Sequence, residues 1–168
     1  LGVDAKRVAA GGGSAGGHLA AATGVVRGFD EPDEDEKISS VPNAMLLFNP
    51  ALDISDRGFP GTRVASIGGL FAGKAKELSP QQHVGEDLPP TIVFHGTQDS
   101  TVPFAQATRF AESMKKAGNR CEVFATEGAG HGYFNYGRGD GMAFVETVKA
   151  ADRFLVSLGY LEGEPTIE

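Results

Sequence analysis

The 168-residue chain is predicted to adopt an α/β fold built on a mostly parallel sheet. Four short apolar runs with strand character alternate with segments of helical character, and such an alternation is typical of a parallel sheet covered by helices. Side chains of the kinds used in catalysis directly follow three of these runs. Because the carboxyl ends of parallel strands meet at one edge of the sheet, we expect these side chains to gather there.

The first predicted strand spans residues 7–11, and its small apolar side chains suit a crowded parallel sheet. A helix of small residues is predicted over 16–27. Between them, residues 12–16 follow the pattern G-x-S-x-G, which in this context is typical of a nucleophile elbow, a turn that exposes a serine Oγ. Ser14 is therefore the candidate nucleophile. The N–H of Ala15, at the start of the helix, is the expected oxyanion donor.

The glycines at positions 12 and 16 are expected to be sterically required, because side chains there would collide with neighbouring backbone in a strained turn. The same stretch has a rival interpretation as a dinucleotide site. Its glycines also fit G-x-G-x-x-G, and Asp30 lies where a ribose-binding acid is expected. Residues 24–29, however, form a poor second strand, and the glycine pattern alone is weak evidence.

An acidic run occupies residues 30–37, where six carboxylates and one lysine account for five of the seven net negative charges. We interpret it as a solvated loop, since it lacks the glycine and the ligand spacing of a calcium loop. No metal site is predicted. The chain also has no basic patch with interleaved aromatic residues, so nucleic acid is not an expected partner.

A second strand is predicted over 44–48, followed by a long connection from 49 to 87. Connections of this length are often functional. Two interpretations stay open: a substrate pocket at the active edge, or a surface crossover with a helix near 67–78. Asp53, in this connection, is the second candidate for a catalytic acid, and His83 is assigned a structural or surface role.

The third predicted strand, 91–95, is buried by composition and is followed by Asp99 and a helix over 104–117. Asp99 lies where catalytic groups of open α/β sheets gather, although it also fits a turn or helix cap. His95, within the strand, is assigned a structural or surface role.

The fourth predicted strand, 121–125, leads into a loop over 126–140 that carries His131 between glycines. Because this loop offers no apolar face to fill, His131 is the candidate general base, and imidazole titrates near neutral pH. Tyr133 and Phe134 are candidate pocket residues, with core packing as the alternative. The closing helix is predicted over 142–158, with one apolar face made of Met142, Val145, Val148, Ala151, Leu155 and Leu158.

Composition sets the remaining expectations. A chain of this length with 40% hydrophobic residues is expected to form one domain, residues 1–168, with a sizeable core. It has no apolar run long enough to cross a membrane. Cys121 is the single cysteine, which excludes an internal disulfide, and its place in a predicted strand indicates a small core residue.

Three motifs together resemble the serine esterases of the α/β-hydrolase fold, in particular the hormone-sensitive-lipase-like and the acetyl xylan or feruloyl esterase-like groups. The motifs are at residues 13–20, 95–103 and 130–134. The resemblance implies Ser14 as nucleophile, Asp99 as acid and His131 as base, in the chain order of that fold. It also implies an acyl-enzyme, a small-molecule or polysaccharide-linked ester substrate, and no metal or cofactor. The dinucleotide interpretation leaves Asp99 and His131 without a role.

Two departures from the family pattern shape these expectations. Gly13 stands where hormone-sensitive-lipase relatives usually have an acidic residue, which favours the carbohydrate-esterase branch. The His-Gly-Gly-Gly-type loop that completes the oxyanion hole is not found in these residues. A peptidase on the same fold and a catalytically silent binding module remain as alternatives.

The same family pattern indicates that the predicted strands are the last four of a longer sheet, so that these residues form the C-terminal portion of the catalytic domain. The elbow strand, normally central, would then be an edge with unpaired backbone groups. We expect either a second copy of the chain or a preceding N-terminal segment to cover it.

Overall fold

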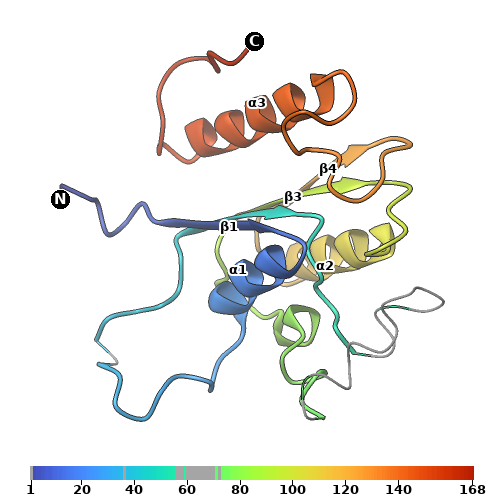
Figure 1. Ribbon diagram of the computed structural model, residues 1–168. Helices are drawn as coiled ribbons and strands as arrows, with labels where there is room; N and C mark the ends of the chain where they lie inside the picture. The colour runs from blue at the N-terminus through green and yellow to red at the C-terminus, as the bar shows by residue number, and fades with distance from the viewer. Residues whose placement is uncertain (1, 36, 56–58, 60–70, 72) are drawn as a thin grey trace.

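The computed structural model describes residues 2–35, 37–55, 59, 71 and 73–168 (Figure 1). Its sheet has four parallel strands in the order β1-β2-β3-β4. Helices α1 and α2 cover one face of this sheet, and α3 covers the other (Figure 1). The predicted α/β fold with a parallel sheet is thus confirmed. The elements are β1 (Ala9–Gly13), α1 (Ala15–Val25), β2 (Ala44–Phe48), β3 (Thr91–Gly96), α2 (Phe104–Lys116), β4 (Cys121–Thr126) and α3 (Met142–Ser157).

Two hydrophobic clusters, one on each face, hold the sheet between its helices. Alternate residues of a strand point to opposite faces. Accordingly, Met45 and Leu47 of β2 pack with α1 and α2, whereas Ala44 packs with Phe94 of β3 and Phe154 of α3. Burial on both faces explains why β2 is entirely apolar and why the middle of β3, Ile92 to Phe94, is apolar as well.

Cys121 lies in the first of these clusters, as the sequence predicted, and is a buried free thiol. Burial raises the pKa of this thiol to about 12. The group is therefore protonated at neutral pH and acts as a small apolar side chain.

The first strand lies two residues later than predicted, at 9–13 instead of 7–11. Its glycines have low intrinsic preference for strands, but they continue the parallel register of β2, with Gly12 opposite Leu47 and Gly13 opposite Phe48. Pairing with a buried neighbour outweighs local propensity here. The strand consequently runs up to the residue before Ser14.

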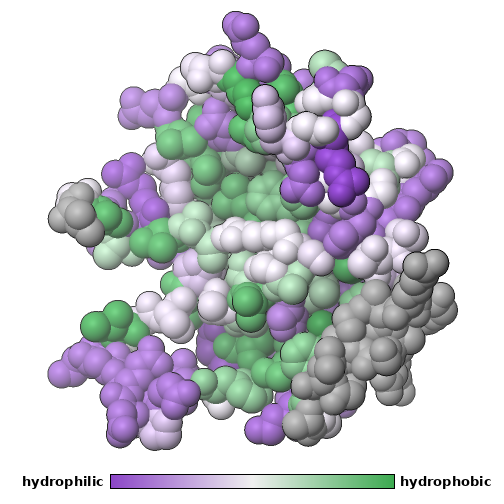
Figure 2. Space-filling view, in the orientation of Figure 1, coloured by the Kyte–Doolittle hydropathy of each residue, from purple (hydrophilic) through white to green (hydrophobic). Residues whose placement is uncertain are grey.

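Strand β1 is at one end of the four-stranded order, and α1 beside it carries no charged residue. Val8 and Leu19 near this edge are exposed, Leu19 to 64%. Figure 2 shows a band of pale and green residues crossing the molecule where β1 and α1 lie. An apolar helix of this kind is normally buried on all sides.

The closing helix begins where expected, and its predicted apolar face is confirmed only in part, at Ala151 and Leu158. Met142 is exposed, and the residues of α3 that are fully buried are Thr147 and Phe154. Ala150, Ala151 and Leu158 pack against the same cluster as Phe154. The position of α3 over β3 and β4 therefore selects the buried stripe, and helical periodicity alone left that choice open.

In the long connection from 49 to 87, the described residues contain one short helix, η2 (Pro80–His83). Of the helix suggested near 67–78, residues 67–70 and 72 lie outside the described residues, and the described residues 73–78 contain turns and no α-helix. A separate expectation concerned membranes. Among the described helices, none combines the length and apolar character needed to cross a bilayer.

Candidate active site

Ser14 occupies the sharp turn between β1 and α1, with φ 55° and ψ −114°. A positive φ is strained for a serine, and backbone hydrogen bonds hold the residue there. Its N–H donates to the Phe48 carbonyl at 2.8 Å, and its own carbonyl accepts from the His18 N–H at 3.0 Å. Sheet and helix together thus fix the turn.

The glycine requirement of the elbow holds at one of the two predicted positions. A Cβ placed on Gly12 would lie 2.5 Å from the carbonyl carbon of Gly16, so only glycine fits there. A Cβ on Gly16 would meet no described atom within 4 Å, and the prediction for this position was wrong. The second close approach is instead at Gly17, whose added Cβ would lie 2.9 Å from Pro50.

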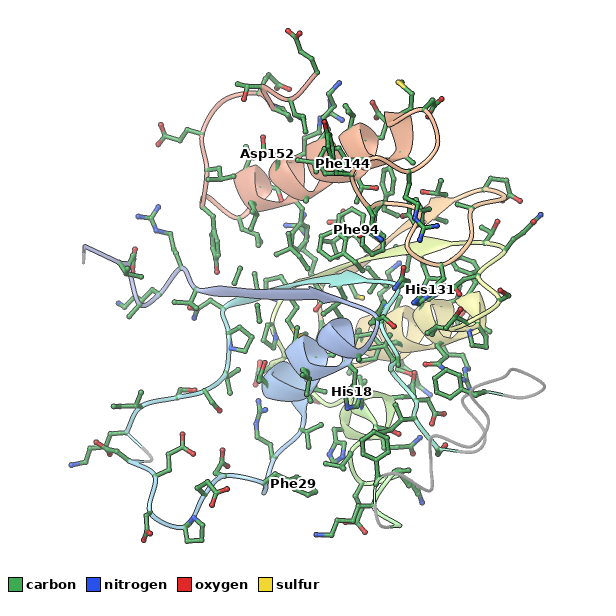
Figure 3. The ribbon with its side chains drawn as sticks, viewed as in Figure 1. His18, Phe29, Phe94, His131, Phe144 and Asp152 are labelled. Atoms are coloured by element: carbon green, nitrogen blue, oxygen red, sulfur yellow. The ribbon has the colours of Figure 1, made fainter. Side chains whose placement is uncertain are left out.

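Ser14, His131 and Asp99 form a continuous hydrogen-bonded chain at the carboxyl edge of the sheet, where Figure 3 labels His131. The His131 Nε2 lies 3.0 Å from the Ser14 Oγ, and the His131 Nδ1 lies 2.7 Å from the Asp99 Oδ2. Because an ionised carboxylate can only accept, Nδ1 carries the proton and Nε2 is left as an acceptor for the serine hydroxyl. This is the arrangement of a nucleophile, a base and an orienting acid.

Asp99 is held as a carboxylate by four donors. Its Oδ1 accepts the backbone N–H groups of Thr101 and Val102 at 2.8 and 2.9 Å, and its Oδ2 lies 2.7 Å from His131 and 3.4 Å from His95. Burial raises the pKa of Asp99, but these hydrogen bonds outweigh burial and lower it from 3.8 to about 2. The group is therefore ionised at neutral pH.

His95 lies fully buried beside this aspartate and is the second-to-last residue of β3. Its Nε2 is 2.9 Å from the Val102 carbonyl as well as close to the carboxylate. Since both neighbours are acceptors, Nε2 carries a proton and donates. His95 therefore has a structural role in the site and no surface role.

The comparison with known proteins decides the family. A family model described as "alpha/beta hydrolase fold" matches residues 1–135. The chain belongs to the alpha/beta hydrolase fold family.

Solved and curated relatives of this alpha/beta hydrolase include several esterases. Esterase 2 of Thermogutta terrifontis, phosphonylated by sarin, is 47% identical with a TM-score of 0.92, and the match covers 97% of this chain and 61% of that one. Esterase LipC of Mycobacterium tuberculosis is 30% identical over 147 residues, covering 79% of this chain and 36% of LipC. A probable isoprenylcysteine alpha-carbonyl methylesterase of Arabidopsis thaliana is 31% identical over 150 residues, covering 77% of this chain and 31% of that protein. The chain thus spans about a third of these two curated relatives and about 60% of the solved esterase.

A small pocket of about 110 Å³ opens beside the serine of this alpha/beta hydrolase. Its walls are mainly apolar, with Ser14 and Ala15 on one side and side chains that include Ile54, Phe59, Phe71 and Val102 on the other. A pocket of this size and lining suits a short hydrocarbon group placed next to the serine Oγ.

His18, on α1, adds a polar atom to this pocket (Figure 3). Its Nδ1 lies 2.9 Å from the Ala51 carbonyl and must therefore carry a proton. Burial lowers the pKa of His18, and the hydrogen bond to Ala51 only partly offsets this. The ring is neutral, so its Nε2 is an acceptor.

Tyr133 and Phe134, the candidate pocket residues, are not among the residues that line the pocket beside Ser14. Phe134 packs on Phe48 with ring centroids 5.2 Å apart, next to Gly13. Tyr133 is buried against Phe134, and burial raises the pKa of its hydroxyl. Both rings thus pack on the side of the sheet where Phe48 lies.

Asp53, the second candidate acid, has contacts of a different kind from those of Asp99. Its carboxylate accepts the N–H of Ser55 at 3.1 Å and lies 3.8 Å from the guanidinium of Arg109. The backbone N–H of Asp53 donates to Gln106 of α2 at 2.9 Å. These contacts tie the connection after β2 to helix α2. Asp99 is the carboxylate that meets His131.

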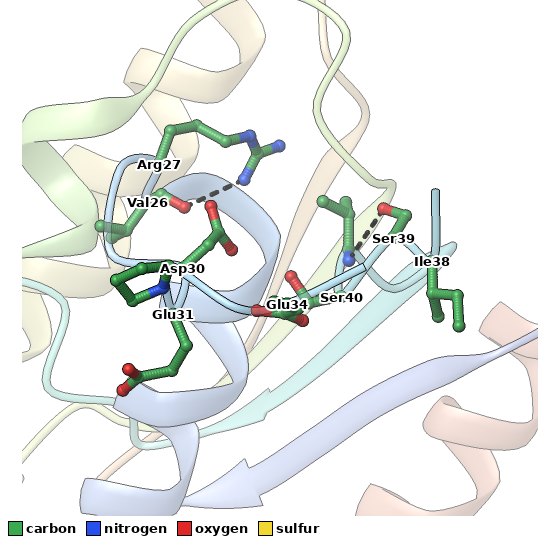
Figure 4. Close-up of a pocket in the computed structure, with 10 residues that line it drawn as sticks. Val26, Arg27, Asp30, Glu31, Glu34, Ile38, Ser39 and Ser40 are labelled. Carbon is green, nitrogen blue, oxygen red and sulfur yellow. Dashed lines mark hydrogen bonds between the residues drawn. The ribbon is translucent and has the colours of Figure 1, made fainter. Parts of the chain in front are cut away.

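The dinucleotide interpretation finds no second strand in the expected place. Residues 27–35 and 37–43 contain no helix or strand, and Asp30 is exposed. A depression of about 330 Å³ with a mixed polar and apolar lining, which includes Arg27, Asp30 and Ile38, lies at the far end of α1 from Ser14 (Figure 4). Over the described part of the chain, no three His, Cys, Asp or Glu side chains gather as metal ligands.

Two residues at the site escaped the sequence reasoning. His18 directly follows the glycine motif but was interpreted as part of a small-residue helix. Asn49 is the first residue after β2, and its side chain contacts the residue after His131. The available signal was its place: polar residues that directly follow parallel strands gather at the active edge.

Proposed function

We propose that the protein containing this chain is a serine carboxylic-ester hydrolase that works through an acyl-enzyme. The main support for this proposal is the chain of hydrogen bonds from the Ser14 Oγ through His131 to Asp99, at 3.0 and 2.7 Å. Ser14 attacks the ester carbonyl carbon while the His131 Nε2 takes its proton. His131 then protonates the departing alkoxide, and the acyl group remains on Ser14.

Deacylation repeats these steps with water. His131 removes a proton from the water, the hydroxide attacks the acyl carbonyl, and the proton returns to Ser14 as the acid leaves. Asp99 stays ionised throughout and holds the imidazole with Nε2 toward the serine. Its low pKa, about 2, supports this role because proton transfer from His131 to Asp99 is unfavourable.

The developing oxyanion is assigned to the N–H of Ala15, the first residue of α1. Groups in the first turn of a helix lack intrahelical partners and lie at the positive end of the helix dipole. A second donor would come from the upstream glycine-rich loop of the family pattern. Loss of one such donor typically lowers kcat about 10²–10³-fold.

A short acyl group is the proposed substrate feature, because the pocket beside Ser14 measures only about 110 Å³ and is mainly apolar. Structures of the Thermogutta terrifontis esterase with propionate and with butyrate bound support this size class. Acetylated sugars, as in acetyl xylan, remain our proposed natural esters within that class. The pocket supports a proposal for the acyl group of the ester, and experiment must identify the alcohol group.

The test uses the full-length protein that contains these residues. Labelling by a fluorophosphonate is expected in the wild type and is expected to be lost in S14A. p-Nitrophenyl acetate and butyrate are expected to be hydrolysed far faster than the octanoate, and an acetylated xylan far faster than a feruloyl ester. Absence of both labelling and turnover would favour a silent binding module, and faster turnover of amides than of esters would favour a peptidase.

A further inference from the structure

Asn49 is buried beneath the loop that carries His131, although the two residues lie far apart along the chain. It directly follows β2, with a relative exposure of 1% and a φ of 36°. Its N–H donates to the Phe94 carbonyl at 2.7 Å, which continues the sheet hydrogen bonding by one residue. A non-glycine residue in this left-handed conformation is uncommon and typical of functional sites.

The orientation of the Asn49 amide follows from its contacts. Its Oδ1 accepts the backbone N–H of Gly132 at 2.9 Å, and a backbone N–H can only donate. The oxygen must therefore face Gly132, which directs the Nδ2 group toward the His131 Nε2 at 3.5 Å. This nitrogen is the one that faces Ser14.

The residue after the histidine is held from a second side as well. Gly132 has a φ of +72°, and a Cβ there would lie 2.8 Å from the Asn135 Nδ2. That same Nδ2 donates to the Gly132 carbonyl at 2.9 Å. Asn49 thus binds the N–H of Gly132, and Asn135 binds the carbonyl of the same residue.

We infer that Asn49 is a positioning residue for His131. Its Oδ1 holds the histidine loop through the Gly132 N–H, and its Nδ2 group, a donor, faces the Nε2 atom that accepts from Ser14. The inference rests on the proposed esterase reaction, in which Nε2 must be free to take the Ser14 proton. Asp99 contacts the other ring nitrogen, Nδ1, so Asp99 and Asn49 contact different nitrogens of the His131 ring.

Among the described residues, the other ionisable groups near the His131 ring are Asp99, which contacts the ring, and His95, which contacts Asp99. Asp99 lies on the loop between β3 and α2, and His95 lies in β3. A carboxylate in place of the Asn49 amide would add a negative charge near Nε2 and so favour a proton there. An opposite charge at this distance shifts titration by about 1–3 pH units.

The experiment compares N49D and N49L in the full-length protein. N49D keeps an oxygen for the Gly132 N–H, and we expect the acid limb of kcat/KM to move up by about one pH unit or more, with activity recovered at higher pH. N49L removes the acceptor and leaves a buried N–H without its partner. We expect its kcat to fall about tenfold or more at every pH, with KM changed less than about threefold.

Asn119 provides a matched control. Its Oδ1 accepts the Leu88 N–H at 2.9 Å and its Nδ2 donates to the Gly85 carbonyl, so it joins two segments much as Asn49 does. N119D is expected to leave the pH profile unchanged. Far-UV circular dichroism and thermal unfolding report whether each variant folds, and if N49L does not fold, the N49D profile alone decides.

Equal losses in N49D and N49L without a pH shift would overturn the inference, because that pattern describes a merely structural residue. A wild-type pH profile in N49D would overturn it as well, while the proposed function would stand. If the wild-type protein neither labels with fluorophosphonate nor hydrolyses esters, the proposed function fails and takes this inference with it.

Discussion

The Asp99 Oδ2 and the His131 Nδ1 lie 2.7 Å apart, and the Asp99 side chain is fully buried. A buried carboxylate that accepts an imidazole N–H fixes both the tautomer and the direction of the ring. The contact joins the loop after β3 to the loop after β4, 32 residues later. It is therefore the relationship on which the proposed chemistry depends.

Replacement of Asp99 by asparagine tests this dependence. In D99N the amide can donate to Nδ1, so the ring is expected to present the wrong tautomer to Ser14. We expect kcat to fall by about 10⁴-fold while the fold is retained. Steady-state kinetics with p-nitrophenyl butyrate measure the effect.

D53N is the matched control for D99N. Asp53 is also buried, but its contacts are with Ser55 and Arg109, so kcat is expected to change less than about tenfold. If D53N loses the activity and D99N keeps it, the assignment of the acid is wrong.

The pKa of Asp99 also predicts an acid-dependent stability. Hydrogen bonding lowers this pKa from 3.8 to about 2 in the folded chain, so the ionised group stabilises the fold above pH 3.8. The contribution is on the order of 2 kcal/mol and is lost as the pH falls from about 4 to 2. Urea unfolding should show D99N less stable than the wild type at pH 7, with the difference shrinking toward pH 2. A difference that is constant with pH would contradict the assignment.

Most of the fold was predictable from patterns of residues that are neighbours in the sequence. The order of strands and helices, and the motifs around Ser14, Asp99 and His131, are patterns of neighbouring residues. The structure brings these three side chains together although Ser14 and His131 are 117 residues apart, since parallel strands end at one edge. Tertiary partners were beyond sequence reasoning. The place of Asn49 directly after β2 indicates the active edge, but it does not indicate the contact with the loop after β4, which joins residues 83 apart.

The same distinction explains the errors in detail. The periodicity of the last helix allowed several faces, and packing over β3 and β4 selected the one with Phe154. Strand β1 extends through glycines because β2 pairs with them. In both cases the partner element chose between locally equivalent alternatives.

The pocket beside Ser14 predicts a change in acyl preference. Phe71 lines the pocket, so F71A is expected to enlarge it and to raise kcat/KM for the octanoate relative to the butyrate by about 10–100-fold. F29A is the control, because Phe29 is largely exposed and is not among the lining residues of that pocket. A preference that stays at wild-type values in F71A would place the acyl group elsewhere.

The open edge of β1 predicts how these 168 residues behave on their own. A strand edge has unpaired N–H and C=O groups that favour pairing with another chain, and the neighbouring Leu19 is 64% exposed. We expect the isolated chain to self-associate, and expect a longer chain that supplies a neighbouring strand to remain monomeric. Light scattering after size exclusion measures both masses. L19E should weaken the association, because a charge at that site opposes burial, whereas I38E, at an exposed residue beside the acidic run, should leave it unchanged. A stable monomer of the 168-residue chain would show that β1 needs no cover.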